Sequence, residues 1–346
     1  MLVELDAPLA PLTTLRLGGP ARRLVTATTD DEVIETVRAA DAAGEPLLVI
    51  GGGSNLVIGD RGFAGTVLRI ATTGFALDGT ELELAAGEVW SEAVARAVDA
   101  GLAGIEFLAG IPGSAGATPV QNVGAYGQEV ATGITEVVAY DRRAGETVVL
   151  SNEECEFSYR HSRFKADPER YVVLRVRFRL EDADGLSTAV RYAEVARTLG
   201  VEAGERVDLA TAYKTVLGLR AGKGMVLDPA DHDTWSAGSF FTNPVLTADQ
   251  YAAFLARLGD RSAPAYPAPG ECTKTSAAWL IDQAGFGKGY GTGPATLSTK
   301  HTLALTNRGA ATTEDLLALA REIRDGVRTA FGVDLVNEPV MIGVAL

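Results

Sequence analysis

Cysteine and histidine are scarce in this sequence. Its 346 residues contain two cysteines, Cys155 and Cys272, and three histidines. The cysteines lie far apart without a paired spacing, and three histidines are too few for a histidine-rich zinc site. We therefore expect a reducing compartment and no bound metal.

Long hydrophobic runs are missing as well. No stretch of about 18 uncharged apolar residues occurs, which a transmembrane helix requires. The N-terminal stretch includes Glu4 and Asp6 and lacks the apolar core of a signal peptide. The expected protein is soluble and cytoplasmic and does not bind membranes.

Basic residues are few relative to acidic ones. Thirty-one Lys and Arg residues stand against 45 Asp and Glu residues, which gives a formal net charge of −14. Such a surface repels nucleic acid and anionic membranes, so neither is expected as a partner. Because salt screens charges beyond about 8 Å, an anionic ligand can still bind in a local basic pocket.

The composition is otherwise that of an ordinary globular protein, with 47% hydrophobic and 22% charged residues. Its length corresponds to two or three domains. Residues 24–58 follow a strand, helix and strand pattern. A helix is expected at 91–100 with Ser91 as its cap, and further strands at 67–70, 82–86, 134–140, 147–150 and 171–180.

A charged, glycine-containing break at residues 182–185 separates these elements from a second pattern. Amphipathic helices are expected at 249–258 and 314–331, and the chain ends on a strand that carries Glu338. We predict an α+β protein with one domain at residues 1–184 and a second at 185–346.

The first candidate site is a glycine turn after an apolar strand, formed by Gly51, Gly52, Gly53, Ser54 and Asn55. Successive glycines allow positive φ and bring backbone N–H groups close to a bound diphosphate. The spacing is not GxGxxG and no helix evidently follows, which disfavours a nicotinamide Rossmann site. For this motif alone, a plain turn between two strands is an equal alternative.

A second glycine-rich stretch runs from Leu108 to Glu129 and carries few charges. The amides of a long uncharged loop can bind a planar heterocycle and its phosphates. Two such segments in one domain predict a dinucleotide site, whereas a buried loop packed on itself is the alternative. The residues expected to contribute are Gly113, Ser114, Gly116, Gln121, Asn122, Gly124 and Ala125.

Basic residues cluster in the segment FSYRHSRFK, which contains Tyr159, Arg160, Arg163 and Lys165. In an extended strand, Tyr159 and Arg163 share one face and Arg160 lies on the other. An inward-facing arginine holds a carboxylate through two parallel hydrogen bonds. A solvated basic strand is the alternative interpretation.

Two further residues stand out for their surroundings. Ser239 lies in WSAGSFFTNP, which is not a GxSxG nucleophile elbow, so its hydroxyl is either a proton donor or part of a cap or turn. Glu338 is a lone acid among apolar residues in VNEPVMIG and needs a partner or a chemical role.

Together, these motifs resemble the UDP-N-acetylenolpyruvoylglucosamine reductase family. The resemblance spans nearly the whole chain in order. It is carried by TTLRLGGPA, GGGSNLV, AGIPGSAGATPVQNVGAYGQE, SYRHSRFK, AGSFFTNP, SAAWLIDQAGFGKG and NEPVMIG.

The resemblance implies a two-subdomain FAD-binding domain of the vanillyl-alcohol-oxidase (PCMH) type, followed by an α+β substrate-binding domain. FAD is expected to bind non-covalently between the subdomains, on the two glycine-rich segments. NADPH is expected to reduce it. The implied product is UDP-N-acetylmuramate, made from UDP-N-acetylglucosamine enolpyruvate for peptidoglycan, and hence for cell-wall growth, cell shape and division.

Residue roles are also implied by the resemblance. Arg160 is expected beside the substrate carboxylate, Ser239 as the proton donor and Glu338 as the acid that stabilises the enolate. The family's longer form carries a tyrosine that closes over the phosphates, which corresponds to Tyr192. The other expected substrate contacts are Tyr159, Lys223, Asn243 and Gln283.

Two alternatives remain open beside this reading. One is an FAD-dependent oxidase of the same superfamily, and the other is a non-catalytic regulator that binds a flavin or a UDP-sugar. No obligate protein partner is inferred.

Overall fold

The computed structural model describes residues 1–346 and divides into two compact units. Unit 1 comprises residues 1–7, 21–52 and 64–226, and unit 2 comprises residues 8–20, 53–63 and 227–346. The predicted division at residue 184 does not coincide with these units. Residues 185–226 belong to unit 1 because Val190, Val195 and Val216 are buried in its core.

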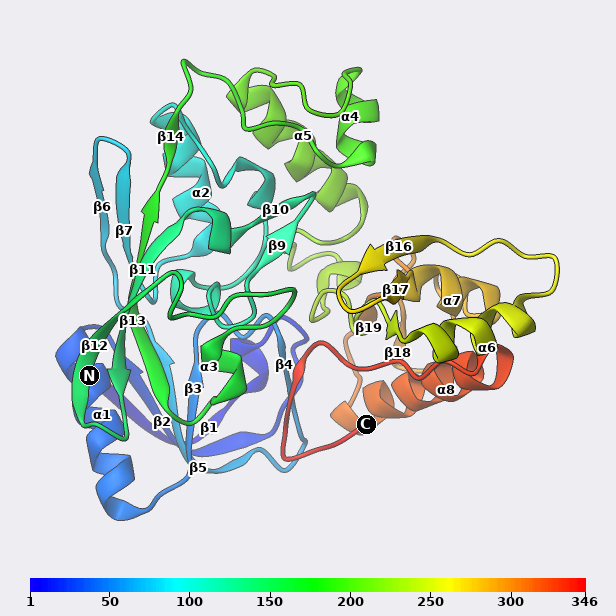
Figure 1. Cartoon of the computed structure of the whole chain (residues 1–346). Helices are drawn as coiled ribbons and strands as arrows, with labels where there is room; N and C mark the ends of the chain where they lie inside the picture. The colour runs from blue at the N-terminus through cyan, green and yellow to red at the C-terminus, as the bar shows by residue number, and fades with distance from the viewer. The chain divides into compact units, whose positions relative to one another are not determined.

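A four-stranded sheet of order β1-β2-β5-β3 opens the chain (Figure 1). Its strands are β1 (Leu2–Pro8), β2 (Pro20–Ala27), β5 (Phe63–Ile70) and β3 (Leu47–Ile50). Helix α1 (Asp30–Ala43) begins where the Thr29 side chain accepts from the Glu32 amide, and it buries Val33 and Val37. The predicted strand, helix and strand pattern is confirmed.

An antiparallel five-stranded sheet forms the centre of unit 1, in the order β12-β11-β13-β7-β6. Helix α2 (Trp90–Asp99) places Trp90 against Phe178 of β13, with ring centroids 5.7 Å apart. Ser91 lies inside α2, so its prediction as the cap is wrong; Val89 precedes the helix and provides no side-chain cap. The strands are β6 (Phe75–Asp78), β7 (Glu81–Ala85), β11 (Ile134–Asp141), β12 (Glu146–Ser151) and β13 (Tyr171–Arg179).

The rest of unit 1 consists of short elements and helices. The short strands are β8 (Leu102–Ala103), β9 (Gly124–Ala125), β10 (Gln128–Glu129) and β14 (Glu181–Asp182). The 3-10 helices are η2 (Glu106–Leu108), η3 (Ala115–Ala117) and η4 (Val130–Thr132). The α-helices are α3 (Arg163–Ala166), α4 (Ala193–Leu199) and α5 (Leu209–Gly222).

Unit 2 packs three helices together, α6 (Ala248–Leu258), α7 (Ala277–Gln283) and α8 (Thr313–Phe331) (Figure 1). Both predicted amphipathic helices are confirmed as α6 and α8. The 3-10 helices are η1 (Ala10–Leu12) and η5 (His232–Thr234). The strands are β4 (Leu56–Ile58), β15 (Val245–Leu246), β16 (Ala265–Ala268), β17 (Cys272–Thr275), β18 (Ala295–Leu297), β19 (Leu305–Asn307) and β20 (Val340–Ile342).

The last strand is shorter than predicted. Strand β20 pairs in parallel with β4 over three residues, and Glu338 precedes it rather than lying within it. Pro339, which has no backbone N–H to donate, lies between Glu338 and the first residue of β20. None of the helices has the length and apolar composition needed to cross a membrane.

Candidate functional site

The two glycine-rich segments meet in unit 1. A Cβ atom on Gly52 would lie 2.6 Å from the Cα of Gly113, and one on Gly51 would lie 2.0 Å from the Ser114 Oγ. Only glycine allows this approach of one backbone to the other. The arrangement fits an FAD-binding cradle, because two backbones come close together with no side chain on Gly51 or Gly52. The chain passes into unit 2 after Gly52.

Two residues predicted to bind the cofactor also pack the second glycine loop. The Asn122 amide donates to Glu129 Oε2 at 2.7 Å and to the Ser158 carbonyl at 3.1 Å, and its Oδ1 accepts from Ala131 N. A Cβ on Gly116 would lie 2.5 Å from the Cβ of Ala86. The loop thus uses the Asn122 side chain and the Gly116 surface for its own packing.

Arg160 lies in a tight turn, so the prediction of an extended strand is wrong. The backbones of Ser158 and His161 exchange two hydrogen bonds of 3.1 Å, and Arg160 adopts a positive φ of 54°. Helix α3 starts directly afterwards with Ser162 as its cap. The turn directs the Arg160 guanidinium back onto the glycine loop, where Nη2 donates to the Gly124 carbonyl at 3.0 Å.

A second arginine, which the sequence did not single out, lies near Arg160. Arg220 near the end of α5 donates from Nη2 to the Met225 carbonyl, while its buried Nε has no hydrogen-bond partner. Burial lowers its pKa to about 10, and the positive charge of Arg160 contributes to the shift. The guanidinium is still cationic at neutral pH. An unsatisfied, buried cationic donor indicates an anion site.

Lys223, three residues after Arg220, contacts one tyrosine and one acid. Its Nζ lies 5.4 Å from the centre of the Tyr126 ring and forms an ion pair with Glu194. The Tyr126 ring meets the half-exposed Tyr192 ring edge to face at 5.4 Å. The structure therefore brings together Lys223 and Tyr192, which were predicted, with Tyr126 and Glu194, which were not.

Burial and the Glu194 carboxylate shift the pKa values of Tyr126 and Lys223. Burial raises the pKa of Tyr126, so its phenol is neutral at physiological pH. Burial alone would lower the pKa of Lys223, but the Glu194 carboxylate outweighs it and raises that pKa. Unit 1 thus presents cationic groups beside the neutral phenol of Tyr126, which suits an anionic ligand.

In unit 2, the backbones around Ser239 and Glu338 lie side by side. Glu338 N donates to the Phe240 carbonyl at 2.8 Å, and Asn55 Nδ2 donates to the Glu338 carbonyl at 3.4 Å. Val340 N donates to the Asn55 carbonyl at 2.9 Å. Three predicted residues that are distant in sequence are thereby gathered.

Ser239 itself lies in an irregular segment rather than at a helix cap. The segment is held by Asp233, whose buried carboxylate accepts from Thr299 N, Thr299 Oγ1 and Arg308 Nη1. Burial would raise the pKa of Asp233, but these donors lower it overall, so the carboxylate is ionised. The Phe240 amide donates to the Leu303 carbonyl, which anchors the other side of Ser239.

Asn243 and Gln283 lie at opposite ends of α7. Asn243 Oδ1 accepts from Ala277 N at 3.0 Å, at the first residue of the helix. Gln283 is the exposed last residue, roughly 9 Å further along the axis at 1.5 Å per residue. The structure does not gather these two predicted contacts into one cluster.

Comparisons with known proteins agree over the whole chain. Residues 21–151 match the FAD binding domain model, and residues 228–342 match the C-terminal domain model of UDP-N-acetylenolpyruvoylglucosamine reductase. Relatives of that name from Streptomyces avermitilis and Mycobacterium avium are 76% and 52% identical, covering 99% and 98% of this chain and 95% of each relative.

Solved structures show the same relationship. The reductase of that name from Thermus caldophilus covers 99% of this chain and 98% of its own, with 28% identity and a TM-score of 0.67. 6-Hydroxy-D-nicotine oxidase from Arthrobacter nicotinovorans shares the fold at 16% identity and a TM-score of 0.52, over 92% of this chain and 83% of its own. The predicted α+β fold of the FAD-binding oxidase type is confirmed.

Proposed function

Because the chain belongs to the UDP-N-acetylenolpyruvoylglucosamine reductase family, we propose that it reduces UDP-N-acetylglucosamine enolpyruvate to UDP-N-acetylmuramate with NADPH as the hydride donor. The FAD-binding domain supports bound FAD, which carries the hydride from one substrate to the other. The observation that carries the proposal is the 76% identity to the Streptomyces avermitilis reductase over 99% of this chain.

The cationic groups of unit 1 bind the substrate's anionic parts. Arg160 and Arg220 hold the carboxylate of the enolpyruvyl group and stabilise the negative charge that builds there when the double bond is reduced. Lys223 holds the diphosphate, with Tyr126 and Tyr192 beside it and Tyr159 as a further contact. Lys223 and Tyr192 both contact the Tyr126 ring, which supports this assignment.

The residues of unit 2 provide the proton. The Ser239 hydroxyl protonates the carbon next to the carboxylate once the neighbouring carbon has been reduced. A serine hydroxyl has a high pKa and donates effectively only to a strongly basic centre, and an enolate is such a centre. Glu338 polarises that centre, and the bonded backbones of the two segments support their joint action. Asn243 and Gln283 contribute polar contacts to the sugar nucleotide.

We place the reaction in the cytoplasm, where peptidoglycan precursors are made, and it thereby serves cell-wall growth, cell shape and division. No obligate protein partner is proposed. The oxidase alternative is disfavoured because no histidine lies in either glycine-rich segment, so a histidyl link to FAD there is not available. The likeness to the nicotine oxidase concerns the fold.

An anaerobic spectral titration tests the function. Bound flavin is reduced with NADPH, and UDP-N-acetylglucosamine enolpyruvate is then added. The oxidised flavin bands should return in proportion to the substrate added. Their return only after oxygen is admitted would favour the oxidase or the non-catalytic regulator and would remove the roles of Arg160, Ser239 and Glu338.

A further inference from the structure

A buried polar network in unit 1, outside the site, centres on Glu106. This carboxylate has no exposed surface and receives no cation. Its Oε1 accepts from Thr188 N at 2.6 Å and from Thr188 Oγ1 at 2.7 Å. Its Oε2 accepts from Gly104 N at 2.7 Å and from Gln128 Nε2 at 3.2 Å. Four hydrogen-bond donors thus satisfy the two buried side-chain oxygens of Glu106.

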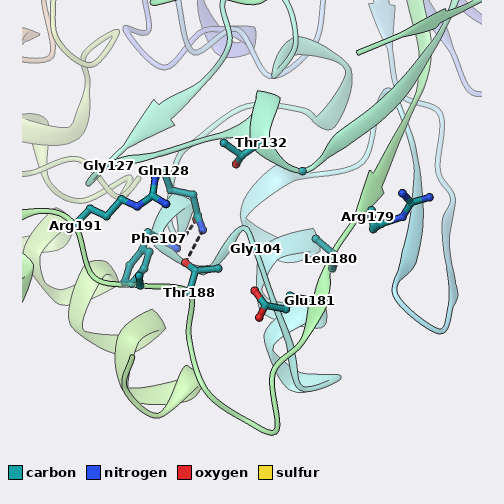
Figure 2. A pocket seen from close by; sticks show the side chains of 12 residues that line it. Gly104, Phe107, Gly127, Gln128, Thr132, Arg179, Leu180, Glu181, Thr188 and Arg191 are labelled. Atoms are coloured by element: carbon teal, nitrogen blue, oxygen red, sulfur yellow. Dashed lines mark hydrogen bonds between the residues drawn. The ribbon is translucent and has the colours of Figure 1, made fainter. Parts of the chain in front are cut away.

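The network joins the second glycine loop to a later part of the chain. Gln128 belongs to that loop, and its Oε1 accepts from Phe107 N while its Nε2 also donates to Thr188 Oγ1 at 3.2 Å. Figure 2 shows Gln128 and Thr188 facing each other on the wall of a cavity of about 220 Å³. Glu106 thus holds the two segments at a fixed separation.

Thr188 is the polar anchor of residues 185–208, which we call the arm. The two sides of the arm are bonded to each other, since Ser187 N donates to the Val207 carbonyl and Val190 N to the Glu205 carbonyl. Beyond these bonds the arm continues to Tyr192 and helix α4. A displacement of Thr188 therefore moves the paired arm as one body, Tyr192 included.

The distances along the chain connect this anchor to the nucleotide site. Gln128 lies two residues after Tyr126, and Thr188 lies four residues before Tyr192. The rings of Tyr126 and Tyr192 are 5.4 Å apart. Because Glu106 binds both Gln128 and Thr188, it determines where one tyrosine stands relative to the other.

We propose that Glu106 is a positioning residue for nucleotide binding, which acts by holding the Tyr192 arm against the glycine loop. The inference rests on the proposed function, which places the substrate phosphates at Tyr192 and Lys223. A carboxylate is required because both of its oxygens accept. The amide of glutamine would direct an NH₂ group at Thr188 or at Gly104, and a buried donor would lose its partner.

The chain also offers a matched control. Glu181, on the wall of the same cavity, pairs with Arg206 of the arm, and both side chains are more than two-fifths exposed. An exposed ion pair contributes little to holding two segments together. Glu181→Gln removes the same charge as Glu106→Gln but breaks only this surface contact.

The test measures UDP binding by calorimetry and trypsin cleavage after the exposed Arg191 and Arg197, scored against Lys288 in unit 2. Glu106→Gln should weaken UDP binding and speed arm cleavage by roughly tenfold each, since an unpaired buried donor has effects of that order. Flavin content and the rate of flavin reduction by NADPH should stay near wild type. Glu181→Gln should change each quantity less than twofold.

Thr188→Val provides a second variant that keeps the side-chain shape and removes one donor to Glu106. It should reproduce the effect of Glu106→Gln, and the double variant should be no worse than Glu106→Gln alone. Unchanged UDP affinity and cleavage in both variants, additive effects, or an equal effect of Glu181→Gln would each overturn the proposal. If wild-type protein fails to bind UDP, the proposed function fails, while the cleavage comparison still decides whether Glu106 anchors the arm.

Discussion

The basic cluster of unit 1 and the Ser239 segment of unit 2 are built in different ways. Arg160, Arg220 and Lys223 carry long charged side chains that extend from a turn and a helix end. Ser239 and Glu338 instead lie in two segments that are joined by the hydrogen bond from Glu338 N to the Phe240 carbonyl. Changes in unit 1 should therefore alter affinity for anions, whereas changes in unit 2 should alter the rate of proton transfer.

Ser239→Ala should give the largest effect. It tests whether changes in unit 2 alter the rate of proton transfer. Flavin reoxidation by the enolpyruvyl substrate should slow by about 10² to 10⁴, because a positioned acid contributes that much. Reduction by NADPH should be nearly unchanged, and stopped-flow absorbance separates the two halves. Ser236→Ala, which removes a hydroxyl from the same segment, is the control. Equal slowing of both halves would contradict the donor role.

Arg220→Met tests whether changes in unit 1 alter the affinity for anionic ligands. Substrate binding should weaken by about 10- to 100-fold, because charge-assisted hydrogen bonds to the carboxylate are lost. UDP, which lacks the carboxylate, should bind about as tightly as before. Calorimetry with both ligands, at equal flavin content, makes the comparison. An equal loss for UDP would assign Arg220 to the phosphates instead.

Two buried aspartates, one in each unit, allow an effect on the free energy of unfolding to be separated from an effect on the rate of flavin reoxidation. Asp141 pairs with Arg170 and Asp233 with Arg308, and both carboxyl pKa values are lowered. Each contributes stability above its unfolded pKa of about 3.9, and that contribution is lost as the pH falls through the lower folded value. Asparagine at either position should cost about 1–3 kcal/mol at pH 7, and less near pH 3.

Only the unit 2 member of this pair should change the chemistry. Asp233→Asn should slow flavin reoxidation by roughly tenfold, because Asp233 holds the Ser239 segment, whereas Asp141→Asn should leave it unchanged. Urea unfolding between pH 3 and 7 and stopped-flow reoxidation measure the two effects. Slowing in both variants would point to a general loss of stability.

Glu194→Gln should give the smallest effect. It tests whether the ion pair with Glu194 weakens the binding of UDP by Lys223. The ion pair between them is partly exposed, so its removal should tighten UDP binding by about two- to fivefold. The pKa of Lys223 should also fall, because burial is no longer opposed by the carboxylate. Glu202→Gln removes the same charge elsewhere in the arm. Tightening in both variants would reflect net charge alone.

Elements with a regular pattern could be predicted from the sequence. The periodicity of α1 and α8 and the alternation in β13 reflect which faces are buried, and that is a local property of the sequence. The turn at Arg160 could not be predicted, because a positive φ at arginine has no local marker.

The same limit applies to the site. Arg220 and Glu194 were missed because their relevance depends on residues far away in the chain. The nearest local signal for Arg220 was Lys223, which follows it by three residues at the end of α5. The hydrogen bonds of the Asn122 side chain within its own loop could not be predicted either, because the sequence does not show which partner a polar residue in a glycine loop selects. The division at residue 184 failed to anticipate that Val190 and Val195 return to the first core.

The pairing of β4 with β20 also bears on the order in which the protein folds during synthesis. Asn55 and Glu338, at the start of this pairing, are 283 residues apart. Every residue of unit 1 has been synthesised by residue 226, while residues 53–63 must wait for the end of the chain. We therefore expect unit 2 to fold last, with the β4 edge unpaired until then. A stalled or truncated chain would leave that edge open to association with other chains.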